Sequence, residues 1–175
     1  MEVSRLGLMR YKMIYRSFFT GYLDKRGFLN PFDIRQLLET IELPNFSLRY
    51  QLISFSEERN TFRGFHFQKK PFEQTKILIV HQGSIKDIMF PIENPTKSPI
   101  IENDLEAGDV IVIPNTFAHG FYTKSSNVLL QYLVDQKFSE KHYSGFSPMG
   151  YIAKHPFDSD LIISDKDKNL PQLNF

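Results

Sequence analysis

The 175-residue sequence contains neither cysteine nor tryptophan. Without cysteine the chain forms no disulfide, offers no thiolate to a metal and has no thiol nucleophile. This composition also fits a reducing compartment, so we expect a cytoplasmic protein. The formal net charge is only +1, and no overall field therefore attracts nucleic acid or an anionic membrane. We expect neither of them as a partner.

Long apolar runs are also missing. No stretch approaches the roughly 20 apolar residues of a membrane-spanning helix. Residues 1–12 are basic but lack the apolar run of a signal peptide. Neither a Gly-x-Ser-x-Gly elbow nor a glycine-rich phosphate loop occurs. Any phosphate group must therefore be bound by individual side chains.

One segment has the pattern of a helix. Apolar residues recur at the i, i+3, i+4, i+7 spacing over residues 34–41. Asn30 is the expected N-cap, Pro31 lies where a first-turn proline is tolerated, and Pro44 ends the segment.

The rest of the chain reads as short β-strands separated by turns, which is typical of a sandwich or barrel. We expect a single domain over residues 1–175, with a core over about 15–135 and a C-terminal extension over about 139–175. Residues 94–103 contain two prolines and are expected to form a loop. The expected strands span residues 47–56, 63–68, 76–81, 84–90, 108–114, 119–123 and 128–134.

Two of the five histidines stand in informative surroundings, His66 and His119. Strand alternation predicts that Arg63 shares a face with the phenylalanines beside His66, while His66 faces the other way. A histidine among small and polar neighbours is suited to act as a base, although a lone histidine is more often structural. Gln68 stands two residues after His66, where a metal-binding cupin has a second histidine, and two imidazoles alone leave a metal short of ligands. We therefore expect no metal site.

Five segments, taken in order, resemble motifs of one family. They are residues 24–28 (DKRGF), 63–68 (RGFHFQ), 74–76 (QTK), 113–121 (IPNTFAHGF) and 164–171 (SDKDKNLP). Together they resemble the dTDP-4-dehydrorhamnose 3,5-epimerase family of cupin-like nucleotide-sugar epimerases, over about residues 24–171. The resemblance implies an all-β, cupin-type jelly-roll barrel with one short N-terminal helix.

The resemblance also implies an activity. The expected enzyme inverts C3, C5 or both of a nucleotide-linked 4-keto-6-deoxyhexose in deoxysugar biosynthesis, and needs no cofactor. Its expected partner is a second copy of the chain, in a homodimer that exchanges N-terminal strands.

The family pattern assigns catalytic roles to four residues. His66 matches the base, Asp167 its carboxylate partner, Tyr132 the acid, and Lys76 a lysine near the C4 oxygen of the sugar. A 4-keto group acidifies the hydrogens at C3 and C5, so a base on one face and an acid on the other suffice for inversion. Histidine and tyrosine have reference pKa values near 6.5 and 10, which suit these roles.

Six further residues match substrate-binding positions. Arg63 and His119 match groups near the diphosphate, and Gln51 matches a residue that lines the nucleotide site. Tyr22 and Phe138 match rings that sandwich the base. Arg26 matches an arginine that reaches the site of the neighbouring subunit.

The chain departs from the family pattern in four places. Residues 52–55 (LISF) replace D-N-x-S, and residues 145–148 (GFSP) replace W-N-D-P. Residues 90–93 (FPIE) replace V-D-x-R, and a family glutamate falls near Pro31. We expect these changes to surround the nucleotide and sugar pockets, so the sequence leaves the nucleotide and the sugar open.

Three other functions stay open at this level. A 3,4-keto-isomerase acting on the same sugars needs the same base chemistry. A cupin that binds a sugar nucleotide without turnover is compatible with the altered segments. A metal-dependent dioxygenase is the least favoured, because the ligand set is short.

Overall fold

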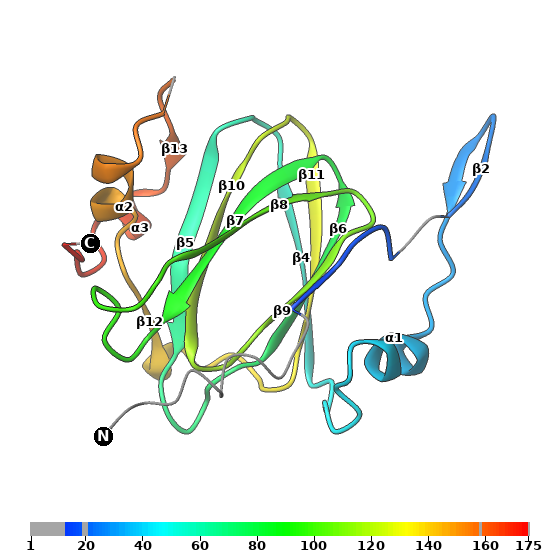
Figure 1. Ribbon diagram of the computed structural model, residues 1–175, viewed down its shortest axis with the longest axis horizontal. Helices are drawn as coiled ribbons and strands as arrows, with labels where there is room; N and C mark the ends of the chain where they lie inside the picture. Colours follow the sequence, from blue (N-terminus) through cyan, green and yellow to red (C-terminus); the bar gives the residue numbers. More distant parts are fainter. Residues whose placement is uncertain (1–12, 19–20, 158, 175) are drawn as a thin grey trace.

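The computed structural model describes residues 13–18, 21–157 and 159–174. The expectation for residues 1–12 lies outside this part of the chain. Two sheets, mostly antiparallel, face each other and form the body of the molecule (Figure 1). The predicted all-β class is confirmed.

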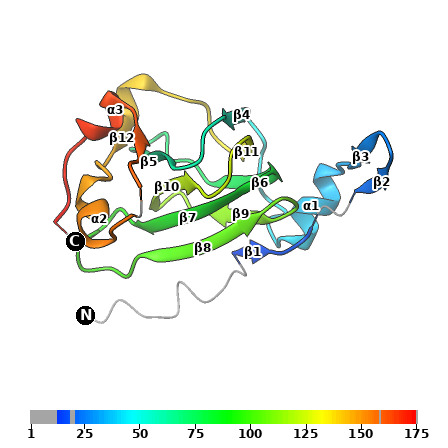
Figure 2. The same ribbon diagram turned by 90° about the horizontal axis from the view of Figure 1, so that it is seen from above.

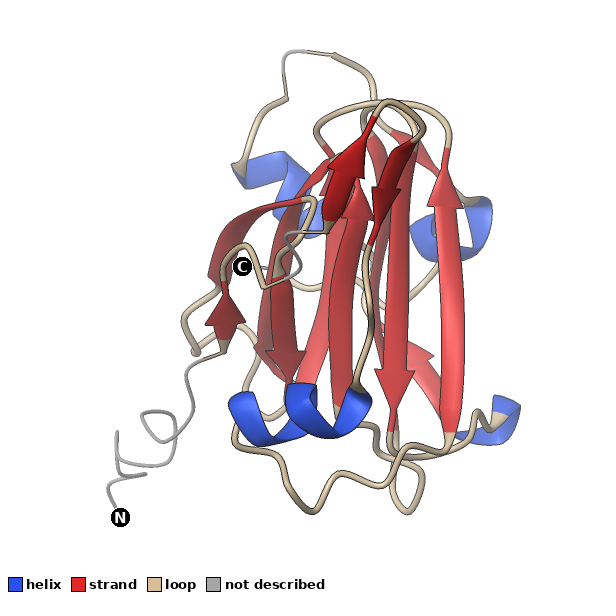
Figure 3. Cartoon of the chain, turned by 90° about the vertical axis from the view of Figure 1, so that its right-hand side faces the viewer, coloured by secondary structure: helices blue, strands red, loops and turns tan. Residues whose placement is uncertain are grey.

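Sheet I has the strand order β1-β9-β6-β11-β4 and sheet II the order β12-β5-β10-β7-β8, with β13 beside β5. The strands of sheet I are β1 (Ile14–Tyr15), β9 (Val110–Ile113), β6 (Lys76–Gln82), β11 (Val128–Val134) and β4 (Tyr50–Ser56). The strands of sheet II are β12 (Tyr143–Gly145), β5 (Thr61–Gln68), β10 (Phe117–Thr123), β7 (Ser84–Pro91), β8 (Ile101–Glu106) and β13 (Ile162–Ile163). Figure 3 shows the long strands running alongside one another, with the helices at the periphery.

Side-chain alternation along the strands divides the core into three layers. Leu78, Ile111 and Leu130 of sheet I pack between the sheets against Met89 and Phe121 of sheet II. Each such side chain contributes about 1.5–3 kcal/mol on full burial. The two outer faces of the sheets are covered by different parts of the chain.

Helix α1 (Ile34–Thr40) covers the outer face of sheet I, where Leu37 and Ile41 pack on Ile77 and Ile79. The outer face of sheet II is covered by the C-terminal segment, which lies on the opposite side of the molecule from α1 (Figure 1). This segment contains η1 (Glu140–His142), α2 (Met149–Lys154) and α3 (Asp165–Lys168). The expectation of one short helix was therefore incomplete. None of the helices in the described residues is long and apolar enough to cross a membrane.

A two-stranded hairpin of β2 (Tyr22–Asp24) and β3 (Gly27–Leu29) projects away from the two sheets, beyond α1 (Figure 2). Its side chains Tyr22, Phe28 and Leu29 are 74%, 60% and 69% exposed. Such a display of apolar groups on a projecting element is typical of a surface that binds another molecule.

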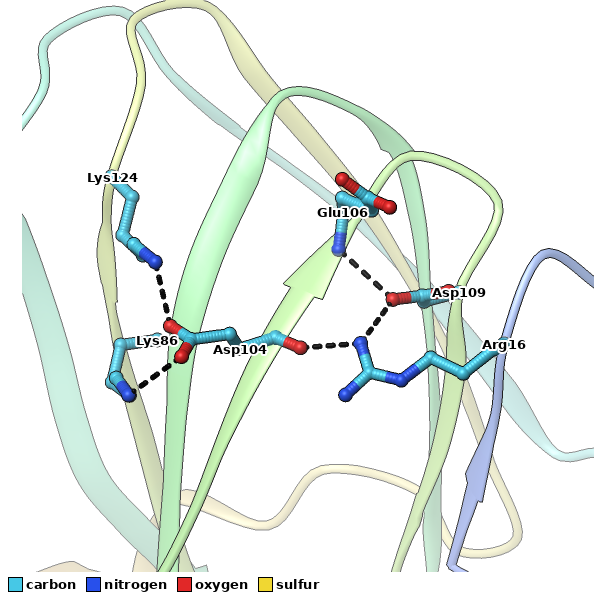
Figure 4. Close-up of polar contacts among 6 residues, drawn as sticks. All are labelled: Arg16, Lys86, Asp104, Glu106, Asp109 and Lys124. Carbon is cyan, nitrogen blue, oxygen red and sulfur yellow. Dashed lines mark hydrogen bonds and ion pairs between the residues drawn. The ribbon is translucent and has the colours of Figure 1, made fainter.

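A polar cluster fastens the short strand β1 to the body (Figure 4). The buried carboxylate of Asp109 accepts hydrogen bonds from Arg16 Nη1 at 2.7 Å, Ser17 N at 2.9 Å and Glu106 N at 3.1 Å. Arg16 also donates to the carbonyl oxygen of Asp104. Arg16 and Ser17 are thereby joined to the turn between β8 and β9.

Two expectations about local structure were wrong. The N-cap of α1 is Asp33, not Asn30, because the Asp33 carboxylate accepts from the amides of Arg35 and Gln36. The loop predicted over residues 94–103 is shorter than expected, because β8 already begins at Ile101.

Candidate active site

A cavity of about 410 Å³ is lined by residues from the inner faces of both sheets and from α3. This volume lies within the range of about 300–1,000 Å³ of small-molecule sites. Seven of the ten predicted site residues line it, namely Arg63, His66, Lys76, His119, Tyr132, Phe138 and Asp167.

An imidazole–carboxylate pair forms one wall of the cavity. His66 Nε2 lies 2.8 Å from Asp167 Oδ1, and the second carboxylate oxygen accepts from the amide of Gly64 at 3.2 Å. Burial raises the pKa of Asp167, but the hydrogen bonds from His66 and Gly64 outweigh burial and leave it below its usual value. The carboxylate therefore stays ionised and holds the ring so that Nδ1 is the nitrogen left for a substrate.

A backbone irregularity in β5 brings Arg63 to the same side as His66. The register between β5 and β10 shifts between His119 and Phe121, and Gly64 has a φ of 135°. A side chain at Gly64 would lie 2.4 Å from Gly120 Cα, so the position requires glycine. The predicted placement of Arg63 with the phenylalanines was wrong, because alternation is interrupted at this glycine.

Tyr132 of β11 lies on the opposite wall, which is formed by sheet I. Burial, and to a lesser extent the charge of Asp87, raise the pKa of its hydroxyl above the ordinary value. The hydroxyl therefore remains protonated until a strong base forms next to it. That property is required of an acid that protonates a carbanion or an enolate.

Lys76 of β6 lies on the same sheet as Tyr132, and its Nζ donates to the carbonyl oxygen of His66 at 3.4 Å. Loss of hydration lowers the pKa of Lys76 to about 8. The ammonium group thus lies close to His66 in a poorly solvated place, where an anionic oxygen of a ligand would interact strongly with it.

A second buried imidazole–carboxylate pair lies beside Tyr132. His119 Nε2 is 2.6 Å from Asp87 Oδ1, and the His119 ring packs edge-on against Tyr132 with centroids 6.1 Å apart. Burial lowers the pKa of His119 despite the neighbouring carboxylate, so the ring is neutral at pH 7. Sequence reasoning missed Asp87; the available signal was a carboxylate between Ile85 and Met89, which are buried on the inner face of β7.

Aromatic and basic side chains surround His66 at its wall of the cavity. Tyr143 packs against Phe138 and His66, with ring centroids 5.9 Å and 5.5 Å apart. Burial, reinforced by the charge of Asp167, raises the pKa of Tyr143 to about 12. Lys166 Nζ lies 4.0 Å from the centre of the Tyr143 ring. Neither Tyr143 nor Lys166 was singled out from the sequence.

Arg63 is held near the inner edge of β4. Its Nε donates to Ser56 Oγ at 3.2 Å, and its Nη2 donates to the carbonyl oxygen of Phe55 at 3.3 Å. The guanidinium group is therefore oriented by one side chain and one backbone group before any ligand binds.

Three predicted residues do not line this cavity. Tyr22 and Arg26 lie on the projecting hairpin, where Arg26 pairs with Asp24. Gln51 accepts from Gln131 Nε2 at 3.0 Å on the outer face of sheet I, while its neighbours Tyr50 and Leu52 line the cavity. Because side chains alternate along a strand, a one-residue offset is enough to change the face.

The altered segments also lie differently from what we expected. Of residues 52–55, Leu52 and Ser54 line the cavity, but none of residues 90–93 or 145–148 does. The expectation that all these changes surround the pocket was therefore wrong. Among the described residues, no three histidine, aspartate or glutamate side chains are grouped as metal ligands.

Comparison with known proteins places this geometry in a family. The family model described as dTDP-4-dehydrorhamnose 3,5-epimerase matches residues 15–174. A curated protein of that name from Sinorhizobium fredii is 29% identical over 126 residues, which cover 69% of this chain and 65% of that protein. A second, from Methanothermobacter thermautotrophicus, is 29% identical over 161 residues, which cover 85% of this chain and 83% of that protein.

Solved structures agree with the sequence comparison. The crystal structure of dTDP-4-dehydrorhamnose 3,5-epimerase from Bacillus anthracis, with TDP and PPi bound, superposes with a TM-score of 0.77 at 33% identity. The match covers 91% of this chain and 93% of that chain. The enzyme of the same name from Sulfolobus tokodaii superposes with a TM-score of 0.70 at 27% identity, over 87% of this chain and 85% of that one.

The two-sheet fold, with an imidazole–carboxylate pair on one wall of its cavity and a tyrosine on the other, is the fold of the cupin-like epimerases. The chain belongs to the dTDP-4-dehydrorhamnose 3,5-epimerase family. The resemblance seen in the ordered motifs is thereby confirmed, and the chain is an epimerase by family.

Proposed function

We propose that this cavity inverts C3, C5 or both of a dTDP-linked 4-keto-6-deoxyhexose, with His66 as base and Tyr132 as acid. The observation that carries the proposal is that these two residues belong to different sheets. His66 comes from sheet II and Tyr132 from sheet I, and both line one cavity. A sugar held between the sheets therefore has a base on one face and an acid on the other.

The steps follow from ketone chemistry. His66 removes the hydrogen next to the C4 carbonyl, and the electron pair of that C–H bond moves onto the C4 oxygen. Tyr132 then donates its proton to the same carbon from the opposite face, which restores the ketone with inverted configuration. Solvent returns a proton to Tyr132 and removes one from His66.

Lys76 is the group best suited to stabilise the enolate oxygen. A single positioned donor contributes about 3 kcal/mol to such a transition state. The location of Lys76 beside His66, in a poorly solvated wall, supports this role. The resident groups supply base, acid and electrophile, so the proposed reaction requires no cofactor.

Substrate binding is assigned to the groups around these three. Arg63 is the candidate for the diphosphate and Phe138 for one face of the base. Neutral His119 donates to Asp87 and is left with an acceptor nitrogen, which suits a sugar hydroxyl better than a phosphate. The TDP bound to the Bacillus anthracis enzyme supports thymidine as the nucleoside.

We infer further that two copies form a dimer that exchanges the N-terminal strands. β4 is an edge strand of sheet I and exposes Ile53 and Phe55 by 74% and 53%, and the projecting hairpin exposes three more large apolar side chains. In such a dimer Arg26 and Tyr22 reach the partner's cavity. The expected cytoplasmic location also stays a prediction.

Mixing two inactive variants tests the dimer. Arg26→Ala and His66→Ala are each expected to be inactive alone. A co-refolded mixture regains about a quarter of wild-type activity, because half of its dimers carry one intact site of two. A mixture that remains inactive although light scattering shows dimers contradicts the exchange.

The activity itself is tested by hydrogen exchange in deuterated water. Wild-type protein is expected to exchange the C3 or C5 hydrogen of dTDP-4-keto-6-deoxyglucose, and His66→Ala is expected to lose this exchange. CDP-, GDP- and UDP-linked analogues test the nucleotide, and NMR of the product distinguishes inversion from migration of the carbonyl to C3. Binding without any exchange would show a sugar-nucleotide-binding protein without turnover.

A further inference from the structure

The segment that replaces the family's W-N-D-P motif, residues 145–148, lies behind the base and not in the cavity. Gly145 pairs with His66 across β12 and β5, and Phe146 exchanges two backbone hydrogen bonds with Phe65, both at 2.8 Å. A side chain at Gly145 would meet the carbonyl oxygen of Phe65 at 2.3 Å. The segment is thus packed directly against the strand that carries the base.

Ser147 extends this contact to the helix that carries Asp167. Ser147 is fully buried, and its Oγ donates to the carbonyl oxygen of Lys168 at 3.0 Å. Its amide donates to the carbonyl oxygen of Pro171 at 2.8 Å, and it forms a β-bridge with Gln172. Ser147 therefore holds the chain that follows Asp167 at two places, Lys168 and residues 171–172.

Helix α3 needs such external support because it is a single turn of four residues. An isolated turn of this length is unstable, and its last carbonyl groups have no partner within the helix. Ser164 caps the N-terminal end, where its Oγ accepts from the Asp167 amide at 3.1 Å. Ser147 satisfies a carbonyl at the C-terminal end.

We propose that Ser147 is a positioning residue of the reaction: it fixes the turn of α3 so that Asp167 meets His66 and Gly64. It contacts neither cavity nor substrate, and it acts through the carboxylate alone. This inference rests on the proposed role of the His66–Asp167 pair.

A double-mutant cycle tests the inference. Ser147→Ala is expected to lower kcat for exchange on the order of tenfold with KM unchanged, because small displacements of a catalytic pair are costly. In the Asp167→Asn background, the same substitution is expected to have no further effect. Ser164→Ala, which releases the other end of the turn, is expected to behave in the same way, and Ser147→Thr, which keeps the hydroxyl, retains most of kcat.

Ser125→Ala is the matched control, since Ser125 Oγ accepts from the Ser84 amide in a turn away from α3. It is expected to lower Tm to a similar extent and to leave kcat unchanged. Equal loss of kcat in Ser125→Ala, an additive loss in the Asp167→Asn background, or wild-type kcat in Ser147→Ala overturns the proposal. Wild-type kcat in Asp167→Asn alone contradicts the proposed role of the His66–Asp167 pair. This result therefore distinguishes a failure of the proposed function from a failure of the role of Ser147.

Discussion

His66 Nε2 and Asp167 Oδ1 lie 2.8 Å apart, although the two residues are 101 positions apart in the sequence. The carboxylate is almost fully buried, while the side chain of His66 is 31% exposed toward the cavity. The pair is therefore asymmetric: the buried carboxylate is held by the Gly64 amide, and the imidazole faces the cavity. This is the arrangement in which a carboxylate sets the tautomer of a base and stabilises its protonated form.

Asp167→Asn is expected to lower kcat for exchange by on the order of 10² or more, because an amide favours the wrong tautomer and no longer stabilises the imidazolium. The measurement is the rate of deuterium incorporation, accompanied by Tm. Asp165→Asn is the matched control on the same helix, since its side chain is 92% exposed and outside the cavity. Equal rates for the two variants would show that the carboxylate has no role in the reaction.

Local patterns predicted the helix and most strands because these depend on neighbouring residues. The apolar spacing over residues 34–41 identified α1, and the apolar runs identified β6, β7, β9 and β11. The ordered motifs also contain five of the residues that the fold brings to one cavity, and the family pattern added Tyr132 and Phe138. Such motifs preserve residue order, and in this fold the residues converge from separate strands.

Features set by long-range contacts escaped prediction. Asp87 can be recognised as a site residue only by its contact with His119, 32 positions away. Arg63 lies on the other face of β5 than predicted because Gly64 interrupts the alternation of side chains. Ser147 looks like a loop serine until the C-terminal chain packs on it. Gln51 was assigned by motif position, but the register of β4 against β11 decides which of its neighbours face the cavity.

Asp109→Ala is expected to destabilise the protein by about 3 kcal/mol, because it removes the buried carboxylate that accepts from Arg16 and from the amides of Ser17 and Glu106. Urea denaturation measures the change in the free energy of unfolding. Asp104→Ala is the control, since Asp104 pairs with Lys86 and Lys124 at a half-exposed position and costs at most about 1 kcal/mol (Figure 4). A larger loss for Asp104→Ala would contradict the structural role assigned to Asp109.

Tyr132→Phe is expected to retain hydrogen exchange at the carbon attacked by His66 but to lose inversion at least tenfold, because only the proton donor is missing. Product NMR measures inversion, and mass spectrometry measures deuterium uptake in the same sample. Tyr143→Phe removes the hydroxyl of another tyrosine that lines the cavity and serves as the matched control. Loss of inversion in Tyr143→Phe with normal inversion in Tyr132→Phe would transfer the acid role to Tyr143.

Lys76 predicts the pH dependence of the reaction. Its pKa is lowered to about 8, so the ammonium form that stabilises the enolate is present below this pH and is lost as the pH rises through it. We therefore expect kcat/KM to fall above about pH 8. Lys76→Arg keeps its charge because a guanidinium group loses its proton only above about pH 12. This variant should be slower but should retain its rate to higher pH. Lys86→Arg, on the same protein but outside the cavity, should leave the wild-type profile unchanged. An alkaline limb that stays in place in Lys76→Arg would mean that another group limits the rate there.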